Sequence, residues 1–205
     1  MNENFLIAGN GMRKMFVAQI ISLVAAGAVL LVALLALVAG GMGSAGLIVI
    51  VGLAAFVAII VSAIMSLMGL YSAGPAHANF KTAFTVTIIN IVVNIIGSFF
   101  KEGLLAGLFD VANVVLGFLV VYFVCTAASE LLTQKGDDYQ ADRGTLIWKM
   151  YFVCTAIAVV CSILAVIPII GALAAIVSVI SSIVELVASI LYLVFLYKAS
   201  ESLLA

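Results

Sequence analysis

The chain has 205 residues, of which 67% are hydrophobic and 8% are charged. A soluble domain has about 45–50% apolar and about 25% charged residues, so this composition excludes an ordinary soluble protein and predicts one that lies in a lipid bilayer. The net charge of −1 offers no basic surface to nucleic acid, and three cysteines within apolar segments do not indicate a disulfide framework.

Six apolar segments follow one another along the chain. They cover residues 15–39, 47–71, 83–100, 104–128, 146–167 and 171–197. A helix of about 20 apolar residues crosses the hydrocarbon core, and runs that do not alternate in polarity argue against barrel strands. The sequence therefore predicts an all-α fold: a polytopic membrane helical bundle of six transmembrane helices, forming one transmembrane domain over residues 1–205.

The links between these segments alternate in length. Residues 40–44, 101–103 and 168–170 are short links, which favour antiparallel helical hairpins. The one sizeable hydrophilic stretch is 129–145, where we expect residues 130–135 to extend the fourth helix and Gly136 to end it. We expect Asp137, Asp138 and Asp142 to lie in a solvated loop.

The cations indicate the orientation of the chain. Seven of them fall on the side shared by both termini: Arg13, Lys14, Lys81, Lys135, Arg143, Lys149 and Lys198. Lys101 alone falls on the other side. Positive residues collect on the cytoplasmic side of bacterial and plasma membranes, so the sequence predicts a multi-pass protein of the cell membrane with both termini in the cytoplasm.

The hairpins also resemble one another. Lys14, Lys81 and Lys149 each open an odd-numbered segment, at intervals of 67 and 68 residues. This spacing predicts a threefold internal repeat of hairpins over about 12–77, 80–142 and 145–205. The alternative is that cytoplasmic helix ends in general collect lysine and aromatic residues.

Polar residues recur at helical spacing inside three of the segments. The last segment carries Ser178, Ser182, Glu185, Ser189 and Tyr192, three or four apart and so on one helix face. The third segment adds Asn90 and Asn94, and the fourth adds Asp110 and Asn113. We expect Glu185, Asn90, Asn94, Asn113 and Asp110 to form an intramembrane polar site, and Ser178, Ser182, Ser189 and Tyr192 to form a helix-packing face.

Glu185 is the strongest functional candidate in the chain. It lies near the centre of an apolar segment, and no Lys, Arg or His lies at comparable depth. Desolvation without a cation favours the protonated carboxyl group, and an ionisable residue inside a membrane marks a solute or ion pathway by default. The alternative is a protonated Glu185 that bonds an asparagine of another helix and only holds the bundle together.

Other residue patterns give no catalytic, cofactor or metal site. His77 is the only histidine, and with no neighbouring Cys or acidic residue in the sequence it is read as a loop residue. No histidine lies in the apolar segments to activate a nucleophile. We therefore expect no enzyme activity and no cofactor.

The run from Cys125 to Leu132, followed by Trp148 and Lys149, resembles small polytopic bacterial membrane proteins of uncharacterised role. That resemblance implies an architecture and no activity. The six-helix size is also similar to the vitamin-binding subunits of energy-coupling transporters, which carry a substantial external loop where this chain has only residues 40–44.

Two functions follow from these observations. The first is transport or permeation of a small solute or a cation, linked to proton or cation binding at Glu185. The second is an accessory or assembly subunit, whose membrane-protein partner, or a second copy of the chain, packs on the bundle or docks on residues 129–145.

Overall fold

The structure is a computed structural model that describes residues 3–38, 45–100, 104–164 and 168–205. Within these ranges, the side chains of residues 30, 33–38, 45–48, 104, 162–164, 168–183 and 185 are outside the description. The predicted links at 40–44 and 101–103 also fall outside the described residues.

The described chain is helical throughout its length, apart from its turns. The helices are α1 (Glu3–Val38), α2 (Ala45–Ala73), α3 (Ala78–Gly97), α4 (Leu104–Lys135), α5 (Asp138–Leu164) and α6 (Pro168–Leu204). All six contain a stretch long and apolar enough to cross a membrane. The prediction of an all-α bundle with six potential membrane spans is confirmed, and it fits a multi-pass membrane protein.

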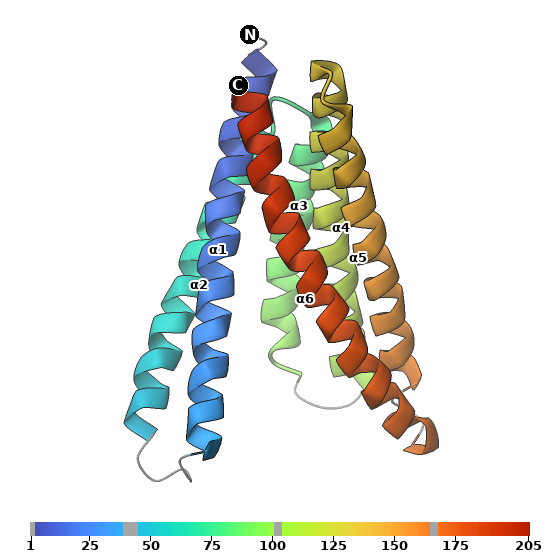
Figure 1. Cartoon of the computed structure of the whole chain (residues 1–205). Helices are drawn as coiled ribbons and strands as arrows, with labels where there is room; N and C mark the ends of the chain where they lie inside the picture. The colour runs from blue at the N-terminus through green and yellow to red at the C-terminus, as the bar shows by residue number, and fades with distance from the viewer. Residues whose placement is uncertain (1–2, 39–44, 101–103, 165–167) are drawn as a thin grey trace.

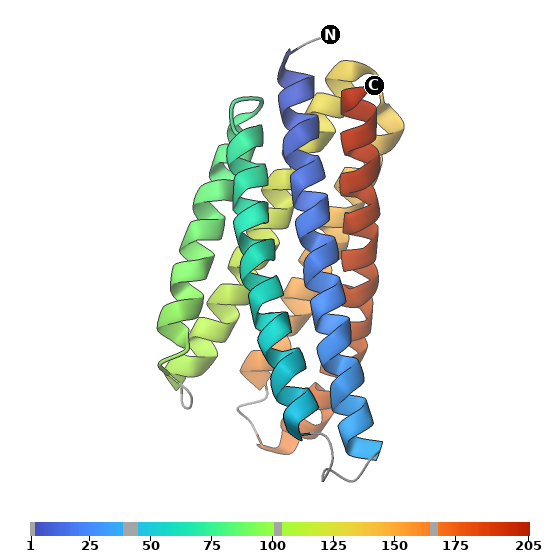
Figure 2. The ribbon, with the colours of Figure 1, turned by 90° about the vertical axis from the view of Figure 1, so that its left-hand side faces the viewer.

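The helices follow one another around the bundle. Each helix packs on the next along the chain, and α6 returns to pack on α1, which closes a ring. Of the consecutive pairs, α2 and α3 make the least extensive contact. Figure 1 shows that both ends of the chain lie at one end of the bundle, together with the α2–α3 and α4–α5 turns. We call this the terminal end, and the opposite one the far end (Figure 2).

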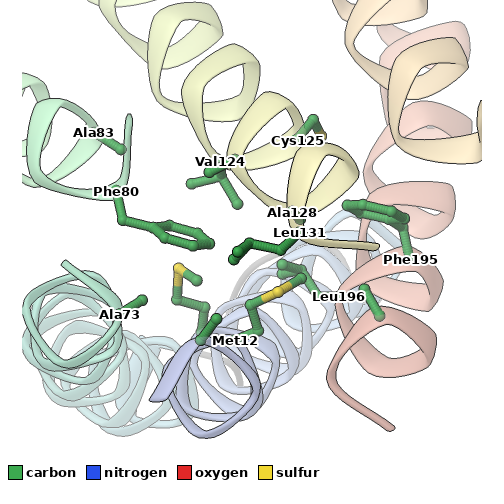
Figure 3. Packing of buried hydrophobic residues seen from close by; sticks show 14 of the residues in the cluster. Met12, Ala73, Phe80, Ala83, Val124, Cys125, Ala128, Leu131, Phe195 and Leu196 are labelled. Atoms are coloured by element: carbon green, nitrogen blue, oxygen red, sulfur yellow. The ribbon is translucent and has the colours of Figure 1, made fainter. Parts of the chain in front are cut away.

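The buried core described by the structure lies toward the terminal end. Every helix contributes a side chain that is less than 2% exposed: Met12, Leu70, Phe80, Leu131, Ile147 and Phe195. Met12, Phe80 and Leu131 meet in the middle of this core (Figure 3). Toward the far end, where α1 and α2 diverge from the other helices in Figure 1, described side chains such as Phe56 and Ile95 are exposed. Apolar side chains exposed on a membrane-spanning bundle face lipid at no hydrophobic cost.

Helices α1 and α2 touch at their backbones. A Cβ atom at Gly11 would lie 2.6 Å from the carbonyl oxygen of Gly69, and one at Gly69 would lie 2.8 Å from the carbonyl oxygen of Gly11. Ser62 Oγ donates a hydrogen bond of 2.8 Å to the carbonyl oxygen of Ala18. Small residues and interhelical hydrogen bonds are what hold helices together where lipid removes the hydrophobic drive.

The α4–α5 turn confirms Gly136 as the end of the fourth helix. Gly136 has φ +89°, its N–H donates to the Thr133 carbonyl, and the Asp137 N–H donates to the Leu132 carbonyl. These two bonds form a Schellman motif. The expected solvated loop that follows is wrong: Asp137 caps α5 by accepting from the Gln140 N–H at 3.2 Å, and Asp138 and Asp142 lie in α5.

Several helix boundaries lie outside the predicted apolar segments, such as the start of α1 at Glu3, and two of these boundaries have a local chemical cause. Helix α5 begins at Asp138, eight residues before the predicted apolar segment, because an N-cap and not hydrophobicity starts it. Residues 168–170 are the first turn of α6 and not a link. Proline suits this position, since the first helical residue needs no N–H donor.

The three hairpins α1–α2, α3–α4 and α5–α6 run in the same orientation (Figure 1). Any up-and-down ring of six helices provides that arrangement. The threefold repeat of 12–77, 80–142 and 145–205 therefore stays a prediction.

Candidate intramembrane polar site

The described part of the polar face of α6, Ser189 and Tyr192, contacts α5. Tyr151 Oη donates a hydrogen bond of 2.9 Å to Ser189 Oγ. The rings of Tyr151 and Tyr192 pack edge to face, with centroids 6.1 Å apart, and Tyr192 is 5% exposed. Ser189 and Tyr192 thus contact α5, and the predicted packing face of Ser178, Ser182, Ser189 and Tyr192 stays a prediction.

A cavity of about 410 Å³ lies beside the Tyr151–Ser189 hydrogen bond. Three helices line it: α4 with Asn113, Val114, Gly117 and Phe118, α5 with Tyr151, Cys154, Thr155 and Ala158, and α6 with Ser189. A water molecule occupies about 30 Å³ of the liquid, and ligand pockets run from about 300 Å³ upward. The cavity therefore has room for several water molecules or one small solute.

Asn113 is a polar residue of this cavity whose side-chain hydrogen bonding is incomplete among the described residues. Its Oδ1 atom is buried and finds no hydrogen-bond donor among the side chains that the structure describes. A buried acceptor without a partner costs about 1–3 kcal/mol. Asn113 can therefore accept a hydrogen bond from an N–H or O–H group that enters the cavity or faces it.

Glu185 belongs to α6, four residues before Ser189. Its side chain is outside the described residues, as are those of Ser178 and Ser182. The predicted roles of these three residues stay predictions.

The remaining predicted site residues lie apart from the lining of the cavity. Asn94 Nδ2 donates to Asn90 Oδ1 at 3.2 Å and to the Asn90 carbonyl oxygen at 3.3 Å, so these two amides bond along α3. Asp110 is exposed on α4. Of the five residues expected to gather, only Asn113 is among the described lining residues.

Tyr151 and Thr155 are site residues that the sequence interpretation missed. Both come from α5, for which the sequence analysis named no polar face. Their four-residue spacing places them on one helix face, and this was the signal that they share a surface.

His77 also has a partner that sequence spacing did not reveal. Its Nε2 atom lies 2.7 Å from Glu130 Oε2, 53 residues away in the chain. Its Nδ1 atom accepts a bond of 3.2 Å from the Asn79 N–H and so caps α3. Because Nδ1 accepts, the neutral ring carries its proton on Nε2 and donates to Glu130. His77 is thus a structural clasp between α3 and α4.

A second clasp ties the α4–α5 turn to the end of α6. Ser202 Oγ donates 2.6 Å to Asp137 Oδ2, and Lys135 Nζ donates to the Ser202 carbonyl oxygen. Beside this turn lies a hollow of about 310 Å³, lined by Ser129, Glu130, Thr133, Gln134, Ala141, Asp142 and Thr145.

No group of three potential metal ligands occurs among the described residues. No protein-family model, curated protein or solved structure matches the chain. The cavity and its lining are therefore the observations from which a function has to be argued.

Proposed function

We propose that the protein is a small membrane permeation or transport protein whose pathway passes through the cavity between α4, α5 and α6. The observation that carries this proposal is a membrane-depth cavity of about 410 Å³ with a buried acceptor at Asn113 and hydroxyl groups at Tyr151 and Ser189. A purely structural contact between helices would close around such an acceptor, because leaving it unpaired is costly.

Glu185 is the proton- or cation-binding group in this proposal. Residues four apart in a helix share a face, so position 185 follows the face that brings Ser189 to the cavity. A carboxyl group there alternates between a neutral form, favoured by desolvation, and a charged form that a cation or polar solute stabilises. Binding and release at this group would couple the solute to a proton or cation.

The proposal also includes the orientation of the protein in the membrane. Both chain ends share the terminal end with the α2–α3 and α4–α5 turns, and most of the cations fall on that side. We infer that the terminal end faces the cytoplasm and that the membrane is the cell membrane. Fusions of a cytoplasm-active and an exterior-active reporter to each end test this: only the cytoplasm-active reporter should work at both ends.

The transport proposal is tested with the purified protein in liposomes. Proton entry is followed with enclosed pyranine under a potassium diffusion potential, and urea and glycerol entry by light scattering. We expect the wild type to exceed protein-free liposomes for at least one probe, and Glu185→Gln to return that flux to the protein-free level. Gln keeps the shape of the side chain and removes its titration.

The matched control is Glu3→Gln, the same substitution at an exposed position in the first turn of α1. It should leave the flux unchanged. Wild-type flux equal to that of protein-free liposomes for all three probes would contradict the proposal, and so would equal flux through the Glu185→Gln and Glu3→Gln proteins.

A second function is an accessory or assembly subunit that docks a partner at the terminal end. The hollow lined by Ser129, Glu130 and Gln134 beside the α4–α5 turn favours it, because the clasps to Ser202 hold that surface in place. In this case a partner should co-purify from gently solubilised membranes, and Glu185→Gln should leave its recovery unchanged. Loss of the partner on replacing Gln134 by Arg would assign the function to this surface.

A further inference from the structure

A hollow of about 630 Å³ runs along α5, and of its described lining residues only Cys154 also lines the first cavity. Its lining is Asp142, Thr145, Leu146, Lys149, Met150, Val153 and Cys154 of α5 with Val184 of α6. Leu146, Val153 and Val184 are each at least 40% exposed. The hollow is therefore a groove on the outside of the bundle, and in a membrane it faces lipid.

The groove has the depth of one membrane leaflet. From Asp142 to Val153 the helix rises roughly 16 Å, at about 1.5 Å per residue, and half of the hydrocarbon core is about 15 Å. The polar lining residues lie toward the terminal end of the bundle. Leu146 lies between Thr145 and Lys149, and the apolar residues Met150, Val153 and Cys154 lie deeper than Lys149. The groove thus has a polar mouth and an apolar body, like a phospholipid molecule.

The charges at the mouth are ordered along the helix. Asp142 lies nearest the start of α5, Thr145 follows, and Lys149 lies deepest. These positions are three, four and seven residues apart and so share one face. The Lys149 amine lies 5.8 Å from the Trp148 ring centroid, and because side chains on a helix lean toward its N-terminus, a lysine at this position can reach toward the end of the helix where Thr145 lies. The order from water inward is a carboxylate, a hydroxyl and an ammonium group.

We propose that this groove binds one phospholipid that carries a primary amine in its headgroup. The lipid phosphate, which is nearer the glycerol, pairs with Lys149 and the Thr145 hydroxyl. The lipid ammonium, which is farther out, donates to Asp142. An acyl chain lies along Leu146, Met150, Val153 and Val184. This inference does not depend on the proposed transport function.

The Asp142 carboxylate determines which lipid headgroup the groove prefers. A primary ammonium group donates N–H bonds to a carboxylate, and charge-assisted bonds of this kind are roughly twice as strong as neutral ones. A trimethylated ammonium group has no N–H to donate. An anionic headgroup without an amine brings its negative charge next to the carboxylate of Asp142. The site therefore selects phosphatidylethanolamine over phosphatidylcholine and phosphatidylglycerol.

Native mass spectrometry of the full chain in detergent tests the proposal. The probes are dioleoyl phosphatidylethanolamine, phosphatidylcholine and phosphatidylglycerol at equal concentration. We expect the wild type to retain the ethanolamine lipid best. Asp142→Asn should remove that preference while keeping the glycerol lipid, and Lys149→Gln should weaken the retention of the ethanolamine and glycerol lipids by about fivefold, the usual effect of one basic residue near a lipid surface.

The controls are the same substitutions at exposed positions outside the groove, Asp138→Asn on α5 and Lys81→Gln on α3. Both should bind lipid as the wild type does. Equal retention of the three lipids by the wild type would overturn the proposal, as would an Asp142→Asn profile equal to that of Asp138→Asn, or a Lys149→Gln profile equal to that of Lys81→Gln. The three lipids are compared on the same sample of each variant, so their relative retention does not depend on the fraction of that variant that folds.

Discussion

Gly11 and Gly69 decide how closely α1 and α2 approach each other. Each occupies a point where a Cβ atom would meet the carbonyl oxygen of the other. Gly27 lies in the same helix as Gly11, but nothing lies within 4 Å of a Cβ atom there. Gly11 and Gly27 of α1 therefore have different roles, although the sequence offers no way to tell them apart.

We expect Gly11→Ala to destabilise the protein by about 1–3 kcal/mol, the usual cost of overpacking, because a backbone carbonyl cannot move aside as a side chain can. Gly27→Ala should be neutral or stabilising by up to about 1 kcal/mol, the helix propensity of alanine over glycine. Thermal unfolding in detergent measures both. A melting temperature for Gly11→Ala at or above that of Gly27→Ala would contradict the close approach.

At Asn113, the side chain that would give the most stable fold differs from the one that the proposed function requires. Its buried Oδ1 atom has no donor among the described side chains, and leucine has a similar volume without the acceptor. We expect Asn113→Leu to stabilise the fold by about 1 kcal/mol, at the low end of the cost of an unpaired buried acceptor, and to abolish the flux attributed to the cavity.

The control for this substitution is Asn90→Leu. Asn90 Oδ1 accepts from Asn94, so replacing it removes a bond and should give no gain in melting temperature. A loss of stability in Asn113→Leu, larger than that in Asn90→Leu, would show that Asn113 already has a donor, as the clasp alternative for Glu185 requires.

At the scale of elements, the α4–α5 turn is a rigid connection and not a loop. A Schellman motif ends α4, Asp137 caps α5, and the same carboxylate accepts from Ser202 at the end of α6. One side chain thus serves two neighbouring helices, and α4, α5 and α6 are fixed relative to one another at the terminal end.

We expect Asp137→Ala to lower stability by about 1–2 kcal/mol, since it removes both the cap and the bond to Ser202. Ser202→Ala should cost less, because the cap survives. The double variant should lose less than the sum of the two single losses, since both remove one shared bond. Additive losses in thermal unfolding would mean that the Asp137–Ser202 bond does not stabilise the protein.

The sequence predicted the number of helices that are long and apolar enough to cross a membrane, because hydrophobic length is a strong signal. It did not predict where α5 and α6 begin, since Asp137 and Pro168 act through capping and backbone chemistry that hydropathy does not register. Gly136 was predicted correctly because a glycine between two helices has a specific conformational role.

The site was harder to predict than the helices. Spacing along α6 placed Ser189 and Tyr192 on one face, and both contact Tyr151 of α5. Spacing cannot say which face of α3 or α4 turns toward α6, so it grouped Asn90 and Asn94 with Asn113. Pairing between helices depends on packing over the whole ring, and the pair of His77 with Glu130 was missed for the same reason.

At the scale of the whole molecule, the core and the clasps share the terminal end. Met12, Phe80, Leu131 and Phe195 are buried there, and His77, Asp137 and Lys135 bond there across helices. The described side chains of α2 nearer the far end are mostly exposed. We infer that the terminal end holds the bundle together, while the lining of the cavity lies farther from that end and the groove extends away from it along α5.

The closed ring has one more consequence, which concerns the order of the helices in the gene. Residues near the two ends of the chain are in contact, since a Cβ atom at Gly9 would lie 2.8 Å from Leu204, and the weakest consecutive contact is between α2 and α3. A circular permutation should therefore be tolerated.

Joining the old ends with a short flexible linker and opening the chain between Pro75 and Ala76 would start it at α3 and end it at α2, with both new ends still at the terminal end. We expect this permuted protein to insert and to melt close to the wild type, whereas opening the chain within the Gly136–Asp137 turn, where the caps of α4 and α5 overlap, should lower the melting temperature. In a closed ring of this kind, we expect the fold to be independent of which helix comes first along the chain.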